Sequence, residues 1–273
     1  MVAGTIEGVL LDLSGTLYSG ADRIDGTRRC LAELEKRRIP YRFLTNTTTQ
    51  SRARIAEKLA SLGVETEDAW ILTPMAAACE RFRADGFKSA ALFVAEEARE
   101  AFAGIPEDPH HPDVCILGDL GRDFSYDLLN RVFRLLEGGA AFYALAQNRC
   151  FERDGARFLD MGPFVEALAY ASRKRPVCLG KPSKAFFERA VAELGLSPAS
   201  VAVVGDDLKS DVLGAMRQGM TGVLVRTGKY NEAQLEQSGE KPDAVIDSIA
   251  ALPAIRSSAV KSGIGKKCCF SYS

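Results

Sequence analysis

Short hydrophobic runs that end in a polar residue recur along the chain. Four of them are Gly8–Asp12, Tyr41–Thr45, Val177–Lys181 and Val201–Asp206. Runs of this length without polar alternation are typical of strands that are buried on both faces of a parallel sheet. We therefore expect four such strands, each with its polar residue at its carboxyl end.

Amphipathic stretches lie between and after these strands. Apolar side chains recur at helical spacing over residues 51–62, 184–194 and 210–218, and a glycine follows each stretch. Glycine in that position is typical of a helix end. Further strands are expected at Gly222–Val225 and Ala244–Ile246, and the alternation of strands with helices predicts an α/β fold.

The middle of the chain repeats this alternation with strands of its own. They are expected at residues 90–94, 114–117 and 141–146, with an apolar helix over 125–136. A chain of 273 residues also exceeds the usual size of a single core. We expect a Rossmann-like parallel-sheet core with a smaller α/β cap domain inserted into it. The expected parts are residues 1–73 (core, first part), 74–175 (cap), 176–257 (core, second part) and 258–273 (disordered tail).

Composition excludes several classes of protein. A formal net charge of −1 offers no broad attraction to nucleic acid or to an anionic membrane. No apolar run approaches the roughly 18 residues of a membrane span, and no secretory signal is expected. The two histidines, His110 and His111, are adjacent, which makes a histidine triad or a histidine-rich metal site a poor hypothesis.

Cysteine usage favours a reducing compartment. The seven cysteines are odd in number and form no C-x-x-C pair, which suits free thiols in the cytoplasm. Two of them, Cys268 and Cys269, lie beside lysines near the end of the chain. An inert tail is the favoured interpretation, with palmitoylation as the alternative.

The residues at the expected strand ends suggest a chemistry. Asp12, Thr45, Lys181 and Asp206 would lie at the carboxyl ends of parallel strands, where α/β sheets bind ligands. An ionised carboxylate can attack phosphorus, and a second can help to hold Mg2+. A lysine and a hydroxyl can bind the remaining phosphoryl oxygens. The set therefore predicts Mg2+-dependent phosphoryl transfer.

Each of these residues also has a purely structural interpretation. Asp12 could cap a turn, Lys181 could be solvated, and Thr45 with Asn46 could belong to helix-capping chemistry. The segment Gly205–Asp211 could be a loop before a capped helix, and it lacks the spacing of a calcium loop. No P-loop motif is present. The joint occurrence of all four segments, in this order after strands, favours the functional interpretation.

Four segments resemble the motifs of the haloacid dehalogenase superfamily. They are Asp12–Leu17, Leu44–Asn46, Gly180–Pro182 and Gly205–Asp211. The insertion between the second and third segments is similar to that of the subclass with a large α/β cap, subclass IIA. The resemblance covers Gly8 to about Pro253 and implies a phosphatase, a hydrolase of phosphoric monoesters or anhydrides.

The resemblance also implies roles for single residues. Asp12 resembles the nucleophile that forms an aspartyl-phosphate, and Asp12, Asp206 and the backbone carbonyl of Ser14 resemble the magnesium ligands. Asp211 resembles an acid that supports these ligands from behind, while Asp207 could face either the metal or solvent.

Lys181 and Thr45 resemble the groups that bind the phosphoryl oxygens, and Asn46 is expected in the same phosphate-binding loop. In the cap, Asp160, Met161 and Gly162 are expected to face the phosphate, with a structural turn as an equal alternative.

Ser14 departs from the commonest pattern of the superfamily, which has an aspartate there as general acid and base. Because a serine hydroxyl is a poor proton donor, we expect substrates whose leaving group needs little protonation, such as pyrophosphate or phosphoramidates among small phosphorylated metabolites. A phosphotransferase or mutase, and a non-catalytic phosphate-binding protein, are the alternatives. The family further suggests a homodimer formed through the cap.

Overall fold

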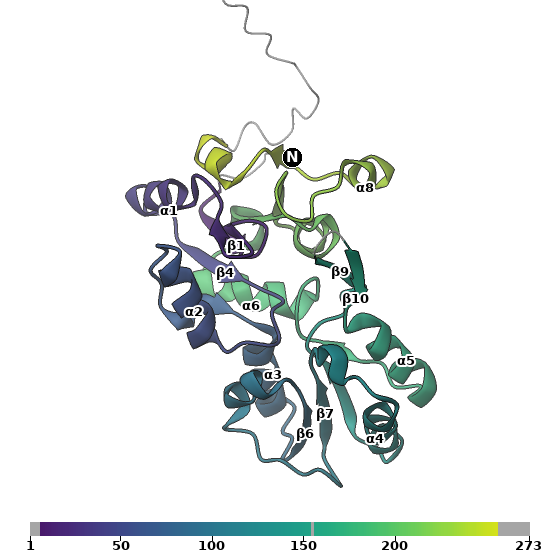
Figure 1. The fold of residues 1–273 in the computed structure, drawn as a ribbon. Helices are drawn as coiled ribbons and strands as arrows, with labels where there is room; N and C mark the ends of the chain where they lie inside the picture. Colours follow the sequence, from purple (N-terminus) through teal and green to yellow (C-terminus); the bar gives the residue numbers. More distant parts are fainter. Residues whose placement is uncertain (1–5, 154–155, 256–273) are drawn as a thin grey trace, which may run out of the picture. The chain divides into compact units, whose positions relative to one another are not determined.

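The computed structural model describes residues 6–153 and 156–255. This part of the chain forms two compact units (Figure 1). Of the described residues, 6–41 and 194–255 make up the first unit, and 42–153 with 156–193 make up the second. Both units alternate strands with helices, which confirms the predicted α/β class.

In the first unit, four parallel strands lie side by side in the order β14, β13, β12, β1. Their bounds are Gly8–Asp12 (β1), Val201–Gly205 (β12), Thr221–Val225 (β13) and Ala244–Ile246 (β14). Leu11 lies beside Val204, and Gly205 lies beside Leu224. The carboxyl ends of β1, β12 and β13 therefore meet at the same edge. Every residue of β1 and β12 is buried, which explains the absence of polar alternation.

Short helices and a hairpin complete the first unit. They are Tyr18–Ser19 (β2) paired with Asp22–Arg23 (β3), Thr27–Lys36 (α1), Pro198–Ser200 (η4), Leu208–Leu213 (η5), Gly214–Met216 (α7), Glu232–Gln237 (α8) and Ile249–Ala254 (η6). The helix expected over residues 210–218 begins earlier, at Leu208. It opens with a wide turn in which the Val212 N–H donates to the Asp207 carbonyl (3.3 Å).

The second unit contains a four-stranded parallel sheet in the order β11, β8, β7, β6. Its strands are Ala90–Phe93 (β6), Val114–Leu117 (β7), Ala141–Ala144 (β8) and Val177–Cys178 (β11). Two further pairs are Tyr41–Leu44 (β4) with Ile71–Leu72 (β5), which is parallel, and Cys150–Arg153 (β9) with Ala156–Leu159 (β10), which is antiparallel.

Helices cover both faces of this four-stranded sheet (Figure 1). The helices of the unit are Arg52–Ser61 (α2), Asp68–Trp70 (η1), Pro74–Ala84 (α3), Glu96–Phe102 (η2), Gly121–Asp123 (η3), Tyr126–Glu137 (α4), Gly162–Ser172 (α5) and Lys184–Leu194 (α6). Ile116 of β7 packs in one cluster with Phe82 of α3. Leu117, the next residue, packs in another with Val132 of α4 and Val165 of α5. Alternation along β7 thus builds two hydrophobic layers.

The expected strand over Val177–Lys181 requires a correction. Only Val177–Cys178 is extended, and it pairs with β8 of the second unit's sheet. The strand stops because the Ser183 N–H donates to the Gly180 carbonyl (2.9 Å) and closes a turn. Lys181 therefore lies in that turn.

The two compact units have their boundaries at residues 41/42 and 193/194, whereas the hydrophobic pattern placed the limits of the cap at 73/74 and 175/176. The expected tail, 258–273, lies outside the described residues. Over residues 6–153 and 156–255, no helix is long and apolar enough to cross a membrane.

Candidate active site

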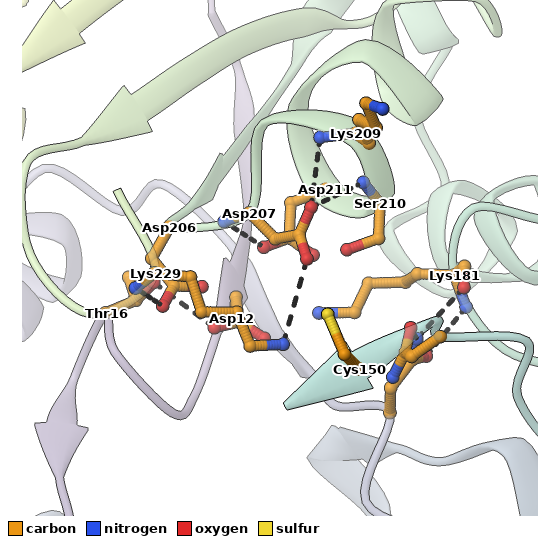
Figure 2. Close-up of polar contacts among 12 residues, drawn as sticks. Asp12, Thr16, Cys150, Lys181, Asp206, Asp207, Lys209, Ser210, Asp211 and Lys229 are labelled. Carbon is orange, nitrogen blue, oxygen red and sulfur yellow. Dashed lines mark hydrogen bonds and ion pairs between the residues drawn. The ribbon is translucent and has the colours of Figure 1, made fainter. Parts of the chain in front are cut away.

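Two carboxylates of the first unit follow neighbouring strands at the same edge of the sheet. Asp12 is the last residue of β1, and Asp206 comes directly after β12. Both are buried, with 7% and 3% of their surface exposed. Asp211 joins them from η5, and oxygens of the three carboxylates lie within 4.8 Å of one another (Figure 2). The structure thus brings together three of the predicted site residues, which we call the carboxylate cluster.

Asp211 reaches the cluster because Gly205 has no side chain. A Cβ at residue 205 would collide with the Asp211 carboxylate. One oxygen of Asp211 accepts a hydrogen bond from the Asp207 N–H (3.2 Å), which fixes the carboxylate against the end of β12. Asp211 therefore supports the loop that carries Asp206.

A tight turn after β1 shapes the other side of the cluster. The Leu17 N–H donates to the Leu13 carbonyl (2.8 Å), and Gly15 has a φ of 85°. Gly15 passes so close to Asp206 that a Cβ there would collide with its carboxylate. The Thr16 hydroxyl, fully buried, donates to Asp12 Oδ2 (3.2 Å). This bond orients the carboxylate that was predicted to be the nucleophile.

The turn Thr227–Lys229 forms hydrogen bonds with both the turn after β1 and the loop after β12. The Thr227 hydroxyl donates to the Gly15 carbonyl (2.5 Å), and the Lys229 N–H donates to Asp206 Oδ2 (2.7 Å). Gly228, at a φ of 59°, leaves room for Asp206. Sequence reasoning assigned no role to this turn. Its position just after β13 was the available signal, because β13 ends at the same sheet edge.

Asp207 has a different role from its neighbour. Its Oδ1 accepts hydrogen bonds from the Lys209 and Ser210 N–H groups (3.0 Å each), so it caps η5. Its other oxygen lies 3.7 Å from Lys229 Nζ. Burial alone would raise the pKa of Asp207, but the Lys229 charge and the hydrogen bonds lower it. Where the sequence left metal or solvent as alternatives, the structure shows a helix cap.

Neighbouring carboxylates of the cluster shift the pKa of Asp206 and of Lys229. Burial, together with the charges of Asp12 and Asp211, raises the pKa of Asp206 to about 8. Burial would lower the pKa of Lys229, but the surrounding carboxylates outweigh it and raise the pKa. Close, buried carboxylate oxygens are the donor set that a hard divalent cation prefers. Asp12 and Asp206 could hold Mg2+, which when bound would neutralise the cluster and the oxygens of a phosphate.

Ser14 lies in the turn after Asp12, and it is exposed. Its backbone pairs with Tyr18 in an isolated bridge. The magnesium contact of its carbonyl remains a prediction.

The second unit groups three other predicted residues. Lys181 and Thr45 are buried, with 2% and 3% of their surface exposed. The Asn46 side chain forms two hydrogen bonds with the backbone of Lys181: Oδ1 accepts from the N–H (2.8 Å), and Nδ2 donates to the carbonyl (2.9 Å). Thr45 Oγ1 accepts from the Thr47 N–H (3.0 Å) and lies 2.8 Å from the Thr47 hydroxyl.

The three residues predicted to face the phosphate from the cap make different contacts. Met161 is fully buried in the hydrophobic cluster of α4 and α5, which favours the structural-turn interpretation for this side chain. A Cβ at Gly162 would collide with the Asn148 carbonyl, which accepts the Gly162 N–H (2.9 Å). Asp160 Oδ1 accepts from the Met161 N–H (2.7 Å). All three residues thus help to form the turn that begins α5.

Known proteins share both the sequence pattern and the fold. The family described as haloacid dehalogenase-like hydrolase matches residues 9–104, and the HAD-hydrolase-like family matches residues 178–252. Haloacid dehalogenase-like hydrolase domain-containing protein 2 of Rattus norvegicus is 35% identical over 243 residues, which are 89% of this chain and 93% of the relative. Phospholysine phosphohistidine inorganic pyrophosphate phosphatase of Bos taurus is 33% identical over 251 residues, 90% of this chain and 92% of the relative.

A solved structure, p-nitrophenyl phosphatase from Archaeoglobus fulgidus, is 25% identical with a TM-score of 0.85, covering 92% of this chain and 99% of that one. The chain is thus an α/β protein whose parallel sheet carries a buried carboxylate cluster at the carboxyl ends of its strands. The chain belongs to the haloacid dehalogenase-like hydrolase family, and it is an enzyme of the phosphatase class. This result confirms the family predicted from the four sequence motifs.

Proposed function

We propose that the protein is a Mg2+-dependent phosphatase that acts through an aspartyl-phosphate on Asp12. The buried cluster of Asp12, Asp206 and Asp211 carries this proposal, because it combines a nucleophilic carboxylate with oxygen ligands for a divalent cation. Asp12, Asp206 and the Ser14 carbonyl would bind Mg2+. Asp211 would hold the loop that carries Asp206.

In the proposed reaction an Asp12 carboxylate oxygen attacks phosphorus, and the bond between phosphorus and the leaving group breaks. Water then attacks the phosphorus of the aspartyl-phosphate, which releases inorganic phosphate and restores Asp12. Lys181 and Thr45 would bind the phosphoryl oxygens and stabilise their charge as it moves. The Thr16 hydroxyl would keep Asp12 oriented for the attack, since it already holds Asp12 Oδ2.

The proposed substrates are small phosphorylated metabolites, pyrophosphate or phosphoramidates. The relative from Bos taurus carries phospholysine, phosphohistidine and inorganic pyrophosphate in its name. Ser14, in place of an acid, favours such leaving groups on chemical grounds. We further propose that residues 74–175 act as the cap, that the protein forms a homodimer through this cap, and that it works in the cytoplasm. The five described cysteines are free thiols, which agrees with a reducing compartment.

A phosphate-release screen tests the proposal. Sugar phosphates, nucleotides, pyrophosphate and phosphoramidates would be assayed with Mg2+ and with a chelator, using wild type, Asp12→Asn and a control, Asp22→Asn, which changes an exposed aspartate of β3. We expect Mg2+-dependent release that Asp12→Asn abolishes and Asp22→Asn leaves intact. Phosphate transferred to a sugar hydroxyl instead of released would indicate a phosphotransferase. Absence of both Mg2+ binding and phosphate release would indicate a non-catalytic binding protein.

A further inference from the structure

The side chain of Asn46 contacts the backbone of one distant residue with both of its polar atoms. It accepts from the Lys181 N–H (2.8 Å) and donates to the Lys181 carbonyl (2.9 Å), across 135 positions of sequence. The second Nδ2 hydrogen points to Asn148 Oδ1, with 3.4 Å between the heavy atoms. The amide thus contacts Lys181 as the peptide group of a neighbouring strand would, and both donor hydrogens are used.

The chain around Lys181 is shaped to admit this amide. A Cβ at Gly180 would lie 2.6 Å from Asn46 Oδ1 and 2.7 Å from the Leu145 carbonyl, so only glycine fits there. On one side the Leu179 N–H donates to the Ala144 carbonyl (2.9 Å), and on the other the Ser183 N–H closes a turn on Gly180. Asn46 holds Lys181, the residue that lies between these two backbone hydrogen bonds.

We infer that Asn46 is a positioning residue, which fixes the backbone from which the Lys181 ammonium reaches the phosphoryl group. This inference rests on the proposed function, in which Lys181 binds phosphate. It replaces the phosphate contact that the sequence predicted for Asn46 with an indirect effect through Lys181. A lysine side chain has a long, flexible stem, so its ammonium is well placed only if its Cα is fixed.

The expected effect is on phosphate recognition. A displacement of about 1 Å in a positioned group can cost about 10²-fold in rate, so loss of the amide should weaken binding of a phosphoryl mimic by about tenfold or more. Loss of a direct contact between Asn46 and phosphate would also weaken binding. The two roles differ in whether the effect persists once Lys181 has been removed.

A double-mutant cycle separates them. The inhibition constant of orthovanadate would be measured with Mg2+ in wild type, Asn46→Ala, Lys181→Met and the double variant. We expect Asn46→Ala to raise the constant about tenfold or more in wild type and to have no further effect beside Lys181→Met. Additive losses, or no loss from Asn46→Ala alone, would overturn the inference.

Asn130→Ala is the matched control, since Asn130 donates to the Tyr126 carbonyl within α4, and it should leave the constant unchanged. If alanine at residue 46 prevents folding, Asn46→Asp retains the acceptor for the Lys181 N–H but loses the donor, and the same cycle applies.

Hydrogen exchange of the Lys181 amide distinguishes the positioning role of Asn46 from the phosphate-binding role of Lys181. Asn46→Ala should accelerate this exchange, whatever Lys181 binds. If Lys181→Met leaves vanadate inhibition unchanged while the amide still loses protection in Asn46→Ala, the phosphate role of Lys181 fails and the backbone contact stands. Unchanged exchange of the Lys181 amide would overturn the positioning role.

Discussion

The carboxylate cluster of the first unit and the Lys181 turn of the second are held in place by different kinds of contact. Asp12 and Asp206 lie at the ends of adjacent buried strands, and Gly15 and Gly228 leave room for the Asp206 carboxylate. Lys181 instead lies in a turn, where a side-chain amide holds its backbone. The buried carboxylate oxygens are a donor set for a divalent cation, whereas the ammonium of Lys181 can bind the oxygen of an anionic ligand. The comparison predicts that metal affinity and phosphate affinity can be lost separately.

The largest effects should come from removing one charge in each unit. Asp206→Asn should lower Mg2+ affinity and phosphate release by about 10²-fold to 10³-fold, because it removes a proposed ligand. Lys181→Met should impair phosphate release while leaving Mg2+ affinity within about threefold of wild type, since the carboxylates remain. Isothermal titration with Mg2+ and a phosphate-release assay would measure the two quantities.

Asp207→Asn is the control for this comparison. It makes the same substitution one residue further on, and asparagine caps a helix about as well as aspartate. Mg2+ affinity should therefore fall much less than in Asp206→Asn, because Asp207→Asn removes a nearby charge and no proposed ligand. Loss of Mg2+ binding in Lys181→Met, or its retention in Asp206→Asn, would contradict the separation of roles.

A second effect concerns the leaving group. If Ser14 donates no proton, negative charge builds on the departing atom, and good leaving groups gain most. With aryl phosphates of graded acidity, log rate should fall steeply as leaving-group pKa rises. Ser14→Asp should flatten this slope if the new carboxylate acts as an acid, a contribution worth about 10²-fold to 10⁴-fold. Similar rates for aryl and alkyl phosphates, with chemistry limiting, would show that another residue supplies the proton.

The carboxylates of the first unit could be predicted from the sequence more completely than the turn that holds Lys181 in the second. Asp12 and Asp206 were found because each ends a hydrophobic run, and parallel strands bring such ends together. Lys181 was identified from its motif, but the strand predicted over Val177–Lys181 was wrong. The extended part ends at Cys178, pairs with β8 and is followed by a turn, and none of these contacts is visible in the local sequence.

The roles of Gly228 and Asn46 depend on partners far away in sequence, Asp206 and Lys181. Met161 was left with two interpretations, because an apolar side chain at a loop end is compatible with a ligand contact and with the core, and its burial favours the core. Long-range contacts between individual atoms leave no local pattern in a single sequence.

A smaller effect should come from the lysine beside the cluster. Lys229 Nζ lies 3.7 Å from Asp207, and its side chain is half exposed. Lys229→Met should tighten Mg2+ binding by about threefold to tenfold at low salt, because it removes a like charge, and less at high salt owing to screening. Lys209→Met is the control, since Lys209 is exposed and its ammonium points away from the cluster (Figure 2). Equal Mg2+ affinities in the two variants would refute the electrostatic role.

The last expected effect is a change in melting temperature with pH. The pKa of Asp206 is raised to about 8 in the folded protein, while an unfolded aspartate titrates near 4. Between these values the folded state binds a proton that the unfolded state does not, so without metal this group's contribution to stability falls as pH rises from about 4 to 8.

At pH 6, Mg2+ must displace the proton from Asp206, whereas at pH 8 a large share of Asp206 is already ionised. The Mg2+-induced rise in melting temperature should therefore be larger at pH 8 than at pH 6. Asp206→Asn, which cannot ionise, should remove both trends, and the difference between wild type and this variant isolates Asp206 from other titrating groups. An equal Mg2+ effect at the two pH values in wild type would mean that Asp206 is already ionised at pH 6, and that the carboxylate cluster is better compensated than its burial indicates.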